Sequence, residues 1–445
     1  MHRVGSGVAR VSRRGYGDQQ EFDSEMEQIF RRCWLFVAHE SEIASPGDYL
    51  TRRLGGEDVI VTRDEHGAVR VFLNSCPHRG TQLCRAGIGN SSHFRCSYHG
   101  WTFSNSGVLR GVPELKQVFA PDFDKTEFRL VEPPHVDVFR GLVFATWDPD
   151  APPLLDELGD ATWYLDAILS KAGDLEVVGP PSRMLVRMNW KLGAENFGGD
   201  GYHLGTTHKT PFDLIFTDEN TKAIPQMHGL DMSRMRGHCV LAGNGHTVRV
   251  QQFTLRPEDQ PSFFGYPEDH WDEIAAGLEP KQVELMSGLA VIHGTIFPHF
   301  SFIDCPHLNT GDDTPPAGVT QVRLWQPIDP MHCELMLFTL VPTWYTPEQR
   351  RHAQRATVRI VGIAGIYESD DFENFVSIAD MNRGRLAQQQ SYVYEAGVHL
   401  APDNDVGWPG TVYAIDHSEV NQREMYRRWA ELMDDDRAAA PAIGG

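Results

Sequence analysis

The feature of this 445-residue sequence that most constrains its fold is a pair of short motifs made of cysteine and histidine. The first motif supplies Cys76 and His78, and the second, after seventeen intervening residues, supplies Cys96 and His99. Two thiolates and two imidazoles in the pattern C-x-H and C-x-x-H suit a metal centre held by two loop tips. The fold must therefore bring these two loops together.

Two kinds of centre could use these four side chains. A [2Fe-2S] cluster of the Rieske type takes two Cys and two His, and a structural zinc site can take the same set. Gly80, Gly100 and Trp101 lie beside the ligand pairs, and small residues let backbone amides approach cluster sulfurs, which favours the Rieske cluster over zinc. Respiratory Rieske proteins are similar but carry an extra cysteine in each loop, where this sequence has Thr81 and Tyr98. That difference favours the lower-potential ferredoxin and oxygenase type.

A second constellation lies in a glycine-rich segment that contains His203 and His208. On an unbroken helix, residues five apart would point about 140° apart, so we expect a break near Gly205 that brings the two imidazoles together. Two histidines and one carboxylate form the facial triad of non-haem Fe(II) enzymes, whose open positions accept O₂. The alternative is two unconnected core or surface histidines.

The carboxylate of this triad is expected in an acidic segment much later in the chain. On a helix, Ile363, Tyr367, Asp371 and Asn374 share one face, which favours Asp371 over Asp370 as the third ligand. The alternative is that this acidic segment is only a solvated helix face.

Asp200 suits a different role in the same site. It precedes His203 by three residues, so it can accept the proton of that ligand's second ring nitrogen, as carboxylates beside metal-bound histidines commonly do. The alternative is a capping or surface carboxylate.

Hydrophobic patterning predicts a β-rich first part of the chain. Runs of Val, Leu, Phe and Thr predict strands at Asp48–Leu54, Asp58–Thr62, Ala68–Leu73 and Gly141–Trp147, with a hairpin turn at Asn105–Gly107. A break rich in Pro and Asp follows. We therefore expect three parts: residues 1–40 as an N-terminal helical segment that packs on the catalytic domain, 41–155 as the all-β cluster domain, and 156–445 as the catalytic domain.

The rest of the chain mixes helices and strands, which predicts an α+β fold. The expected helices are Gln19–Trp34, Leu154–Ser170, Thr346–Ile366 and Ser418–Met433, and the expected strands are Met184–Trp190, Thr247–Leu255 and the antiparallel pair Gln321–Gln326 and Glu334–Pro342. Residues 311–316 and 434–445 read as a loop and a loose tail.

Composition limits the possible partners and compartments. The formal net charge of −21 argues against a surface that binds nucleic acid. No apolar run is long enough for a signal segment or a bilayer span, so a cytoplasmic protein without membrane contact is expected. The seven cysteines are too few for a disulfide framework and fit reduced thiols plus a metal site.

Both constellations, in this order, resemble the catalytic α subunits of aromatic-ring-hydroxylating dioxygenases, the naphthalene and biphenyl dioxygenase group. The resemblance runs from about Phe30 to Met433 and includes Asn189-Trp190-Lys191 and Glu195-Asn196 before the first iron histidine. It implies an all-β Rieske domain and a catalytic domain in which helices surround an antiparallel sheet. It also implies a terminal oxygenase that takes electrons from a ferredoxin or reductase through the Rieske cluster to a mononuclear Fe(II), and adds both atoms of O₂ to an aromatic ring as a cis-dihydrodiol.

The same resemblance implies an α₃ assembly, in some members α₃β₃, in which the cluster of one subunit serves the iron of its neighbour. Asp200 would then connect His203 of its own subunit to the partner subunit's His99. The positions that would line the substrate cavity are Asn196, Phe197, Leu204, Phe212, Val291, His293, Trp325, Ile360, Val361 and Tyr367.

These lining positions are mostly apolar and include no Arg or Lys, which favours a neutral aromatic substrate. Tyr367 stands where the family often has Trp, and the position of His293 also varies in the family. Three other functions stay open at this stage: a Rieske monooxygenase that hydroxylates or demethylates, an electron-transfer protein that uses only the cluster, and a zinc-stabilised binding module.

Overall fold

The computed structural model describes residues 2–4, 7–215, 235–253, 261–307, 316–362 and 365–434. The chain divides into two compact units. One unit is formed by Met26–Leu154, and the other by Met1–Glu25 together with Leu155–Asp435. We refer to them as the cluster unit and the catalytic unit. No helix among the described residues is long and apolar enough to cross a bilayer.

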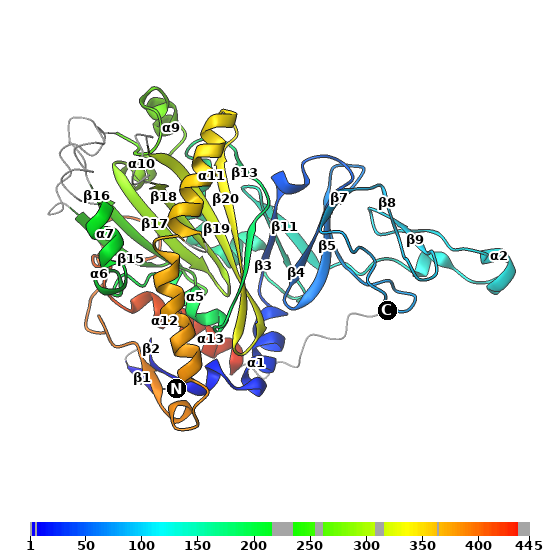
Figure 1. The fold of residues 1–445 in the computed structure, drawn as a ribbon, viewed down its shortest axis with the longest axis horizontal. Coiled ribbons are helices and arrows are strands. Elements are labelled where there is room, and N and C mark those ends of the chain that lie inside the picture. The colour runs from blue at the N-terminus through cyan, green and yellow to red at the C-terminus, as the bar shows by residue number, and fades with distance from the viewer. Residues whose placement is uncertain are drawn as a thin grey trace. The chain divides into compact units, whose positions relative to one another are not determined.

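The cluster unit is built from small antiparallel sheets (Figure 1). Its four-stranded sheet has the order β6-β5-β4-β7, and two three-stranded sheets have the orders β11-β12-β3 and β10-β9-β8. The strands of the three sheets are β3 (Leu35–His39), β4 (Asp48–Leu54), β5 (Glu57–Arg63), β6 (Val69–Leu73), β7 (Ile88–Asn90), β8 (His93–Arg95), β9 (Thr102–Ser104), β10 (Leu109–Gly111), β11 (His135–Phe139) and β12 (Leu142–Thr146). The predicted β-rich character of this part is confirmed.

The catalytic unit is organised around one nine-stranded antiparallel sheet. Its order is β13-β20-β19-β18-β17-β16-β15-β22, and β14 also pairs with β20. The strands of this sheet are β13 (Leu175–Val177), β14 (Ser182–Val186), β15 (Met235–Leu241), β16 (Thr247–Phe253), β17 (Leu289–Ile296), β18 (Phe300–His307), β19 (Ala317–Asp329), β20 (His332–Pro342) and β22 (Thr411–Tyr413). The predicted antiparallel pairing of residues 321–326 with 334–342 is confirmed by β19 and β20.

Helices pack against this sheet, as Figure 1 shows for α11. Helix α5 contacts β17, β18 and β19, and helix α11 contacts β18, β19 and β20. The helices of this unit include α1 (Gln19–Glu25), α4 (Ala161–Ser170), α5 (Trp190–Phe197), α6 (Leu204–Thr207), α7 (Lys209–Ile215), α9 (Trp271–Ala276), α10 (Pro280–Met286), α11 (Pro347–Val361), α12 (Glu368–Met381) and α13 (Val420–Met433). A further small sheet pairs β1 (His2–Val4), β2 (Gly7–Ser12) and β21 (Ser391–Val393). The α+β prediction is confirmed.

Several predicted elements differ from those observed. The predicted helix Gln19–Trp34 is α1 followed by a π-helical turn at Met26–Phe30, and the predicted helix Leu154–Ser170 is two helices, α3 (Leu154–Leu158) and α4, separated at Gly159, whose φ is +49°. The predicted strand Met184–Trp190 ends at Val186. Residues 254–255, 311–315, 363–364 and 435–445, which belong to other predicted segments, lie outside the described residues.

The strand ends early because Asn189 starts a helix. The Asn189 side chain accepts a hydrogen bond from the Lys191 amide at 3.1 Å, which caps α5 at its N-terminus. The cap matters for function because α5 leads directly into the segment that carries the paired histidines. The motif Asn189-Trp190-Lys191 therefore fixes where this segment begins.

A buried ion pair anchors the start of α5. Lys191 Nζ lies 2.5 Å from Glu25 Oε1, with side-chain exposures of 1% and 0%. The indole groups of Trp190 and Trp429 also donate to the Glu25 carboxylate, each at 2.8 Å. Glu25 is therefore the shared acceptor for three donors from α5 and α13.

A Glu25→Ala variant is expected to lose about 3–5 kcal/mol of stability, because it leaves the Lys191 ammonium buried without a counter-charge. Urea denaturation of the purified protein, followed by tryptophan fluorescence, measures the loss. Glu27→Ala is the matched control, since Glu27 pairs with Arg31 at the surface and its removal is expected to cost less than about 1 kcal/mol. Equal denaturation midpoints for the two variants would contradict the prediction.

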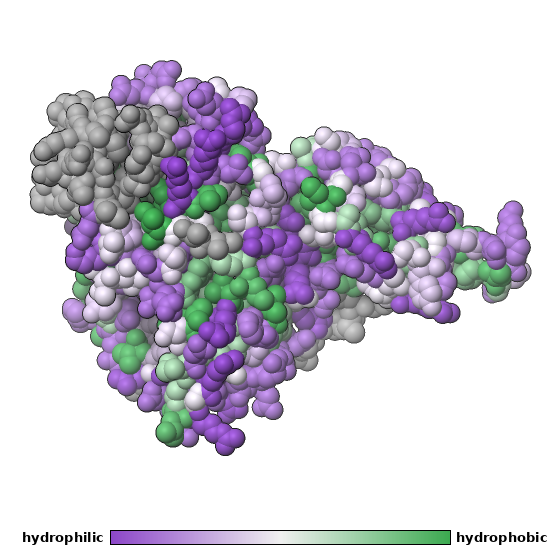
Figure 2. Space-filling model, in the orientation of Figure 1, coloured by the Kyte–Doolittle hydropathy of each residue, from purple (hydrophilic) through white to green (hydrophobic). Residues whose placement is uncertain are grey.

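The outer surface is mainly hydrophilic on the face that Figure 2 shows, with apolar side chains gathered in patches. Exposed large apolar residues of the catalytic unit include Leu185, Val358 and Met381. Single exposed apolar side chains of this kind are ordinary for folded proteins and carry no function by themselves.

Candidate metal centres and active-site cavity

The two cysteine-histidine motifs form loops of the same geometry. In the first loop the Gly80 amide donates to the Cys76 carbonyl at 2.8 Å, and the Cys76 amide donates to the Thr81 carbonyl at 2.9 Å. In the second loop Gly100 and Trp101 make the same two bonds with Cys96, at 3.0 and 2.8 Å. Both glycines have positive φ, +71° and +74°, a conformation that other residues rarely adopt.

These loops bring the four predicted cluster residues together. Cys76 and Cys96 are 1% and 3% exposed and lie in the core of the cluster unit, whereas His78 and His99 are only half-buried. The two imidazole rings lie with their centroids 4.6 Å apart, and His78 stacks on Trp101. Two buried thiols and two half-buried imidazoles are the ligand set that a two-iron Rieske cluster would need.

One buried polar atom at this site is consistent with a metal. His78 Nδ1 is buried and has no hydrogen-bond partner, and an imidazole nitrogen left without a partner in a folded protein needs an explanation. Bonding of that nitrogen to iron would provide one. The residues present therefore fit a Rieske cluster.

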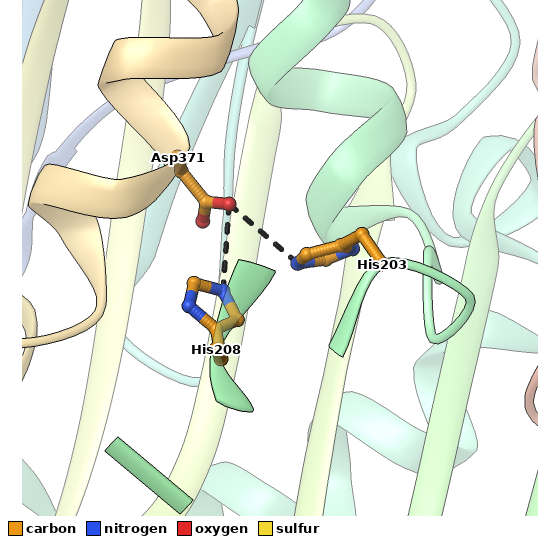
Figure 3. A group of neighbouring side chains, drawn as sticks. All are labelled: His203, His208 and Asp371. Carbon is orange, nitrogen blue, oxygen red and sulfur yellow. Dashed lines mark ion pairs between the residues drawn. The ribbon is translucent and has the colours of Figure 1, made fainter. Parts of the chain in front are cut away.

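The second predicted site is a group of three side chains in the catalytic unit. One ligand atom from each of His203, His208 and Asp371 lies within 4.8 Å of the others. Asp371 Oδ1 is 3.5 Å from His203 Nε2 and 3.4 Å from His208 Nε2. Figure 3 shows the carboxylate, on α12, pointing toward both imidazoles. Two imidazoles and one carboxylate gathered in this way fit a non-haem iron.

The local path of the chain between the histidines differs from the expectation. The predicted break at Gly205 is wrong, because helix α6 continues through Gly205 from Leu204 to Thr207. His203 and His208 instead flank this single helical turn, and the helix ends at His208, whose φ and ψ of −99° and 19° leave the helical range. The two histidines are the end residues of a short helix, and their ring centroids lie 4.9 Å apart.

Each of these two histidines has a second carboxylate near its other ring nitrogen. Asp200 Oδ2 lies 3.1 Å from His203 Nδ1, and Asp370 Oδ2 lies 3.6 Å from His208 Nδ1. Burial tends to raise the pKa of Asp200, but its contact with His203 holds that pKa below its usual value. Asp200 is therefore a carboxylate beside one histidine ring, and Asp370 occupies an equivalent place beside the other ring.

Close packing of glycines holds the turn that carries Asp200. A Cβ on Gly201 would lie 1.9 Å from the Asp416 carbonyl oxygen, and a Cβ on Gly199 would lie 2.2 Å from Asn421 Nδ2. Gly205, four residues after Gly201, has no atom within 4 Å of such a Cβ. Gly201 and Gly199 therefore cannot carry a side chain without displacing a neighbour, whereas Gly205 can.

A Gly201→Ala variant is therefore expected to displace the turn and lower the amount of mononuclear iron that the protein retains after dialysis. Metal analysis of the purified protein measures this retention. Gly205→Ala, in the same segment, is the matched control and is expected to retain iron like the wild type. Unchanged iron retention in both variants would show that the turn tolerates the displacement.

A cavity opens beside the three clustered side chains. The predicted lining residues that the structure places on its wall are Asn196, Phe197, Leu204, Phe212, Val291, His293, Ile360, Val361 and Tyr367. Trp325 does not line it: its ring is fully buried behind Phe197, with the ring centroids 5.6 Å apart, and its indole donates to Ser301 Oγ. The Tyr367 ring packs edge-on against His208.

The expectation of a wall without Arg or Lys is wrong, because Arg249 and Arg323 both line the cavity. Each guanidinium is compensated by a carboxylate. Arg249 Nη2 lies 2.5 Å from Asp416 Oδ2, and Arg323 Nη1 lies 2.7 Å from Glu368 Oε2. Desolvated arginines are tolerated here because they are paired.

Further wall residues that the sequence did not indicate are Gln251, Phe253, Leu289, Ile303, Cys305, Pro306 and Glu368. A signal for some of them was present. In the predicted strand Thr247–Leu255, Arg249 and Gln251 alternate with Val248 and Val250, which indicates one polar face on a buried strand. Ile303 and Cys305 gave no comparable signal.

The pair Glu195-Asn196 also has a structural explanation. The Glu195 carboxylate is half-buried and accepts hydrogen bonds from the hydroxyl groups of Tyr394, at 2.8 Å, and Tyr426. Burial raises the pKa of Glu195 to about 7. This carboxylate ties α5 to α13, while Asn196 beside it lines the cavity.

Two protein families match separate parts of the chain. A family described as the Rieske [2Fe-2S] domain matches residues 33–125, and the ring hydroxylating alpha subunit (catalytic domain) matches residues 155–435. The large oxygenase component of the naphthalene 1,2-dioxygenase system of Ralstonia sp is 33% identical over 95% of this chain and 93% of that protein.

Two further similarities bear on function. The alpha subunit of an N,N-dimethyl phenylurea N-demethylase from Sphingobium sp. (strain YBL2) is 32% identical over 96% of this chain and 92% of that protein. The crystal structure of naphthalene 1,2-dioxygenase from Rhodococcus sp. bound to indole superposes with a TM-score of 0.87 at 37% identity, covering 96% of this chain and 95% of that one.

Proposed function

Because this chain belongs to the ring-hydroxylating α subunits of the Rieske non-haem iron oxygenases, we propose that it adds both atoms of O₂ to an aromatic ring as a cis-dihydrodiol. The cofactors of such an oxidoreductase are a Rieske [2Fe-2S] cluster and a mononuclear iron. The single observation that supports the proposal most is the grouping of His203, His208 and Asp371 on the wall of a largely apolar cavity.

The proposed ligands follow from the geometry of each site. Cys76, His78, Cys96 and His99 would hold the cluster, and His203, His208 and Asp371 would hold the iron. When bound, the cluster supplies electrons singly and the iron supplies the site at which O₂ is activated. Asp370, 3.6 Å from a ring nitrogen of His208, is better suited to orient that histidine than to bind iron.

The protein's own contribution is to bind and orient the substrate and to exclude water. Phe197, Leu204, Phe212, Val291 and Ile360 give the cavity apolar surfaces that suit an aromatic ring. The Tyr367 ring, packed on His208, closes the wall next to the proposed iron. Burial raises the pKa of Tyr367, so its hydroxyl stays protonated.

Electron supply is proposed to cross between subunits of an α₃ assembly, which in some relatives includes β subunits. In each subunit Asp200 would connect His203 to the partner subunit's His99. Exposure supports this arrangement, because Tyr202 beside Asp200 is 68% exposed and Tyr98 beside His99 is 59% exposed. Both ends of the proposed path therefore lie at the surface of their own units. The electron donor would be a ferredoxin or a reductase.

Product analysis under ¹⁸O₂ tests the proposal. The metal-loaded protein, supplied with a reductase, a ferredoxin and naphthalene, is expected to form a diol that carries two labelled atoms. The demethylase relative shows that related α subunits perform another reaction. A product with one labelled atom, or removal of a methyl group from an N-methyl arene without diol formation from any arene, would replace dioxygenation by the monooxygenase alternative.

A further inference from the structure

A polar cluster lies on the sheet wall of the cavity, apart from the metal-facing side chains. Arg249 on β16 is directly opposite His293 on β17 in the strand register, and Gln251 is opposite Val291. Because alternate residues of a strand share one face, Arg249 and Gln251 both face the cavity. Arg249 is 1% exposed and His293 is 8% exposed, so this cluster is buried in the wall.

Hydrogen bonds fix the Arg249 guanidinium in one orientation. Its Nε donates to the Asp416 carbonyl at 3.2 Å, its Nη2 to Asp416 Oδ2 at 2.5 Å, and its Nη1 to His293 Nε2 at 3.0 Å. His293 Nδ1 in turn donates to the Phe197 carbonyl at 2.9 Å. Burial, with a further contribution from the charge of Arg249, lowers the pKa of His293 to about 3, so the ring is neutral and its Nε2 is an acceptor.

This arrangement leaves hydrogen-bonding capacity unused. A guanidinium carries five N–H groups, and the three bonds above use one each on Nε, Nη1 and Nη2. One N–H on Nη1 and one on Nη2 have no acceptor among the described residues. Buried donors without an acceptor are costly, so an acceptor supplied by a ligand in the cavity would be bound favourably.

The charges around Arg249 determine which kind of acceptor a ligand can offer. Asp416 already neutralises Arg249, and His417 Nδ1 lies 2.6 Å from the second oxygen of Asp416. An aryl carboxylate would bring a second buried negative charge without a cation of its own. A neutral oxygen adds no charge. The other wall arginine, Arg323, also has a buried donor without a partner, its Nε. However, the Phe197 ring covers the face of this guanidinium at 4.0 Å, and Glu368 occupies its Nη1.

We propose that Arg249 determines substrate specificity by donating hydrogen bonds to a neutral acceptor oxygen, a carbonyl or nitro oxygen, carried by the aromatic substrate. Asp416 and His293 are positioning residues that hold the guanidinium for this contact. The proposal rests on the proposed function, since it concerns the substrate of the same cavity. It narrows the expected neutral aromatic substrate to one that carries such an oxygen.

The test compares two aromatic compounds of nearly the same shape, 1-acetylnaphthalene and 1-isopropenylnaphthalene, of which only the first offers the acceptor oxygen. The metal-loaded wild type, with its electron donors, is expected to show a kcat/KM about tenfold higher for the ketone. Calorimetric titration of the same enzyme without O₂ is expected to give a correspondingly lower Kd for the ketone. No preference for the ketone in either measurement would overturn the proposal.

The variants separate this contact from general effects on folding. The double variant Arg249→Leu with Asp416→Ala removes both charges together and is expected to abolish the preference while still binding 1-isopropenylnaphthalene. Arg249→Lys keeps the charge opposite Asp416 but lacks the planar donors, and it is expected to reduce the preference as well. The control double variant Arg52→Leu with Glu42→Gln removes a buried ion pair of the cluster unit and is expected to keep the preference.

The outcomes distinguish the two proposals from each other. A preference that survives in both Arg249 variants would refute the role of Arg249 and leave the oxygenase function standing. A wild type that oxidises neither compound, nor naphthalene, would refute the proposed function. In that case the binding preference alone would still show whether Arg249 recognises the oxygen.

Discussion

An Asp371→Ala variant is expected to contain about two irons per chain, where the wild type contains about three, and to form no oxidised aromatic product. Asp371 Oδ1 faces Nε2 of both His203 and His208, so its removal leaves only two of the three proposed ligands. His208→Ala is expected to give the same result. Iron analysis, together with product analysis in the presence of electron donors, measures both effects.

The cluster provides an internal control for this experiment. The visible absorbance of the Rieske centre should be unchanged in both variants, because its four proposed ligands lie in the other unit. Asp370→Ala is the matched variant and is expected to keep about three irons per chain, since Asp370 lies beside His208 Nδ1 and not between the two imidazoles. Product formation by the Asp371→Ala protein, or loss of the third iron on changing Asp370 alone, would refute the assignment of Asp371.

The parts of the fold that the sequence predicted well are those in which local pattern and tertiary structure agree. Strand β4 has the predicted bounds, Asp48–Leu54, and the long pair β19 and β20 was visible as two apolar runs around a short turn. The similarity to ring-hydroxylating α subunits, which rests on the two sets of proposed metal ligands, is confirmed by the comparisons. Ligand spacing is informative because the metal dictates it.

The parts that the sequence did not predict depend on contacts between distant residues. The glycine at position 205 suggested a break near that residue, but α6 runs through it. The glycine that close packing requires is Gly201, because a side chain there would collide with Asp416, more than two hundred residues later in the chain. Trp325 was expected on the cavity wall by resemblance and lies behind Phe197. Arg249 is on the wall because Asp416 neutralises it, and no local pattern indicates that pairing.

The path of electrons to the iron gives the second large expected effect. An Asp200→Asn variant is expected to bind both metals but to form product about 10–100-fold more slowly than the wild type. Asparagine can still accept the hydrogen bonds that Asp200 Oδ1 receives from the amides of Tyr202, at 3.0 Å, and His203, at 3.4 Å, so the turn should persist. The amide nitrogen that replaces Oδ2 cannot accept a proton from His203 Nδ1, which lies 3.1 Å from Oδ2.

Single-turnover kinetics locate the effect within the reaction. In a chemically reduced Asp200→Asn protein mixed with O₂ and substrate, re-oxidation of the Rieske cluster, followed by its visible absorbance, should slow by the same factor as product formation. Asp370→Asn is the matched control, because Asp370 lies at 3.6 Å from the other histidine and is more exposed, with 39% against 32% of its side chain accessible. Its effect should be much smaller. Cluster re-oxidation at the wild-type rate in Asp200→Asn would leave both metal assignments intact and remove Asp200 from the electron path.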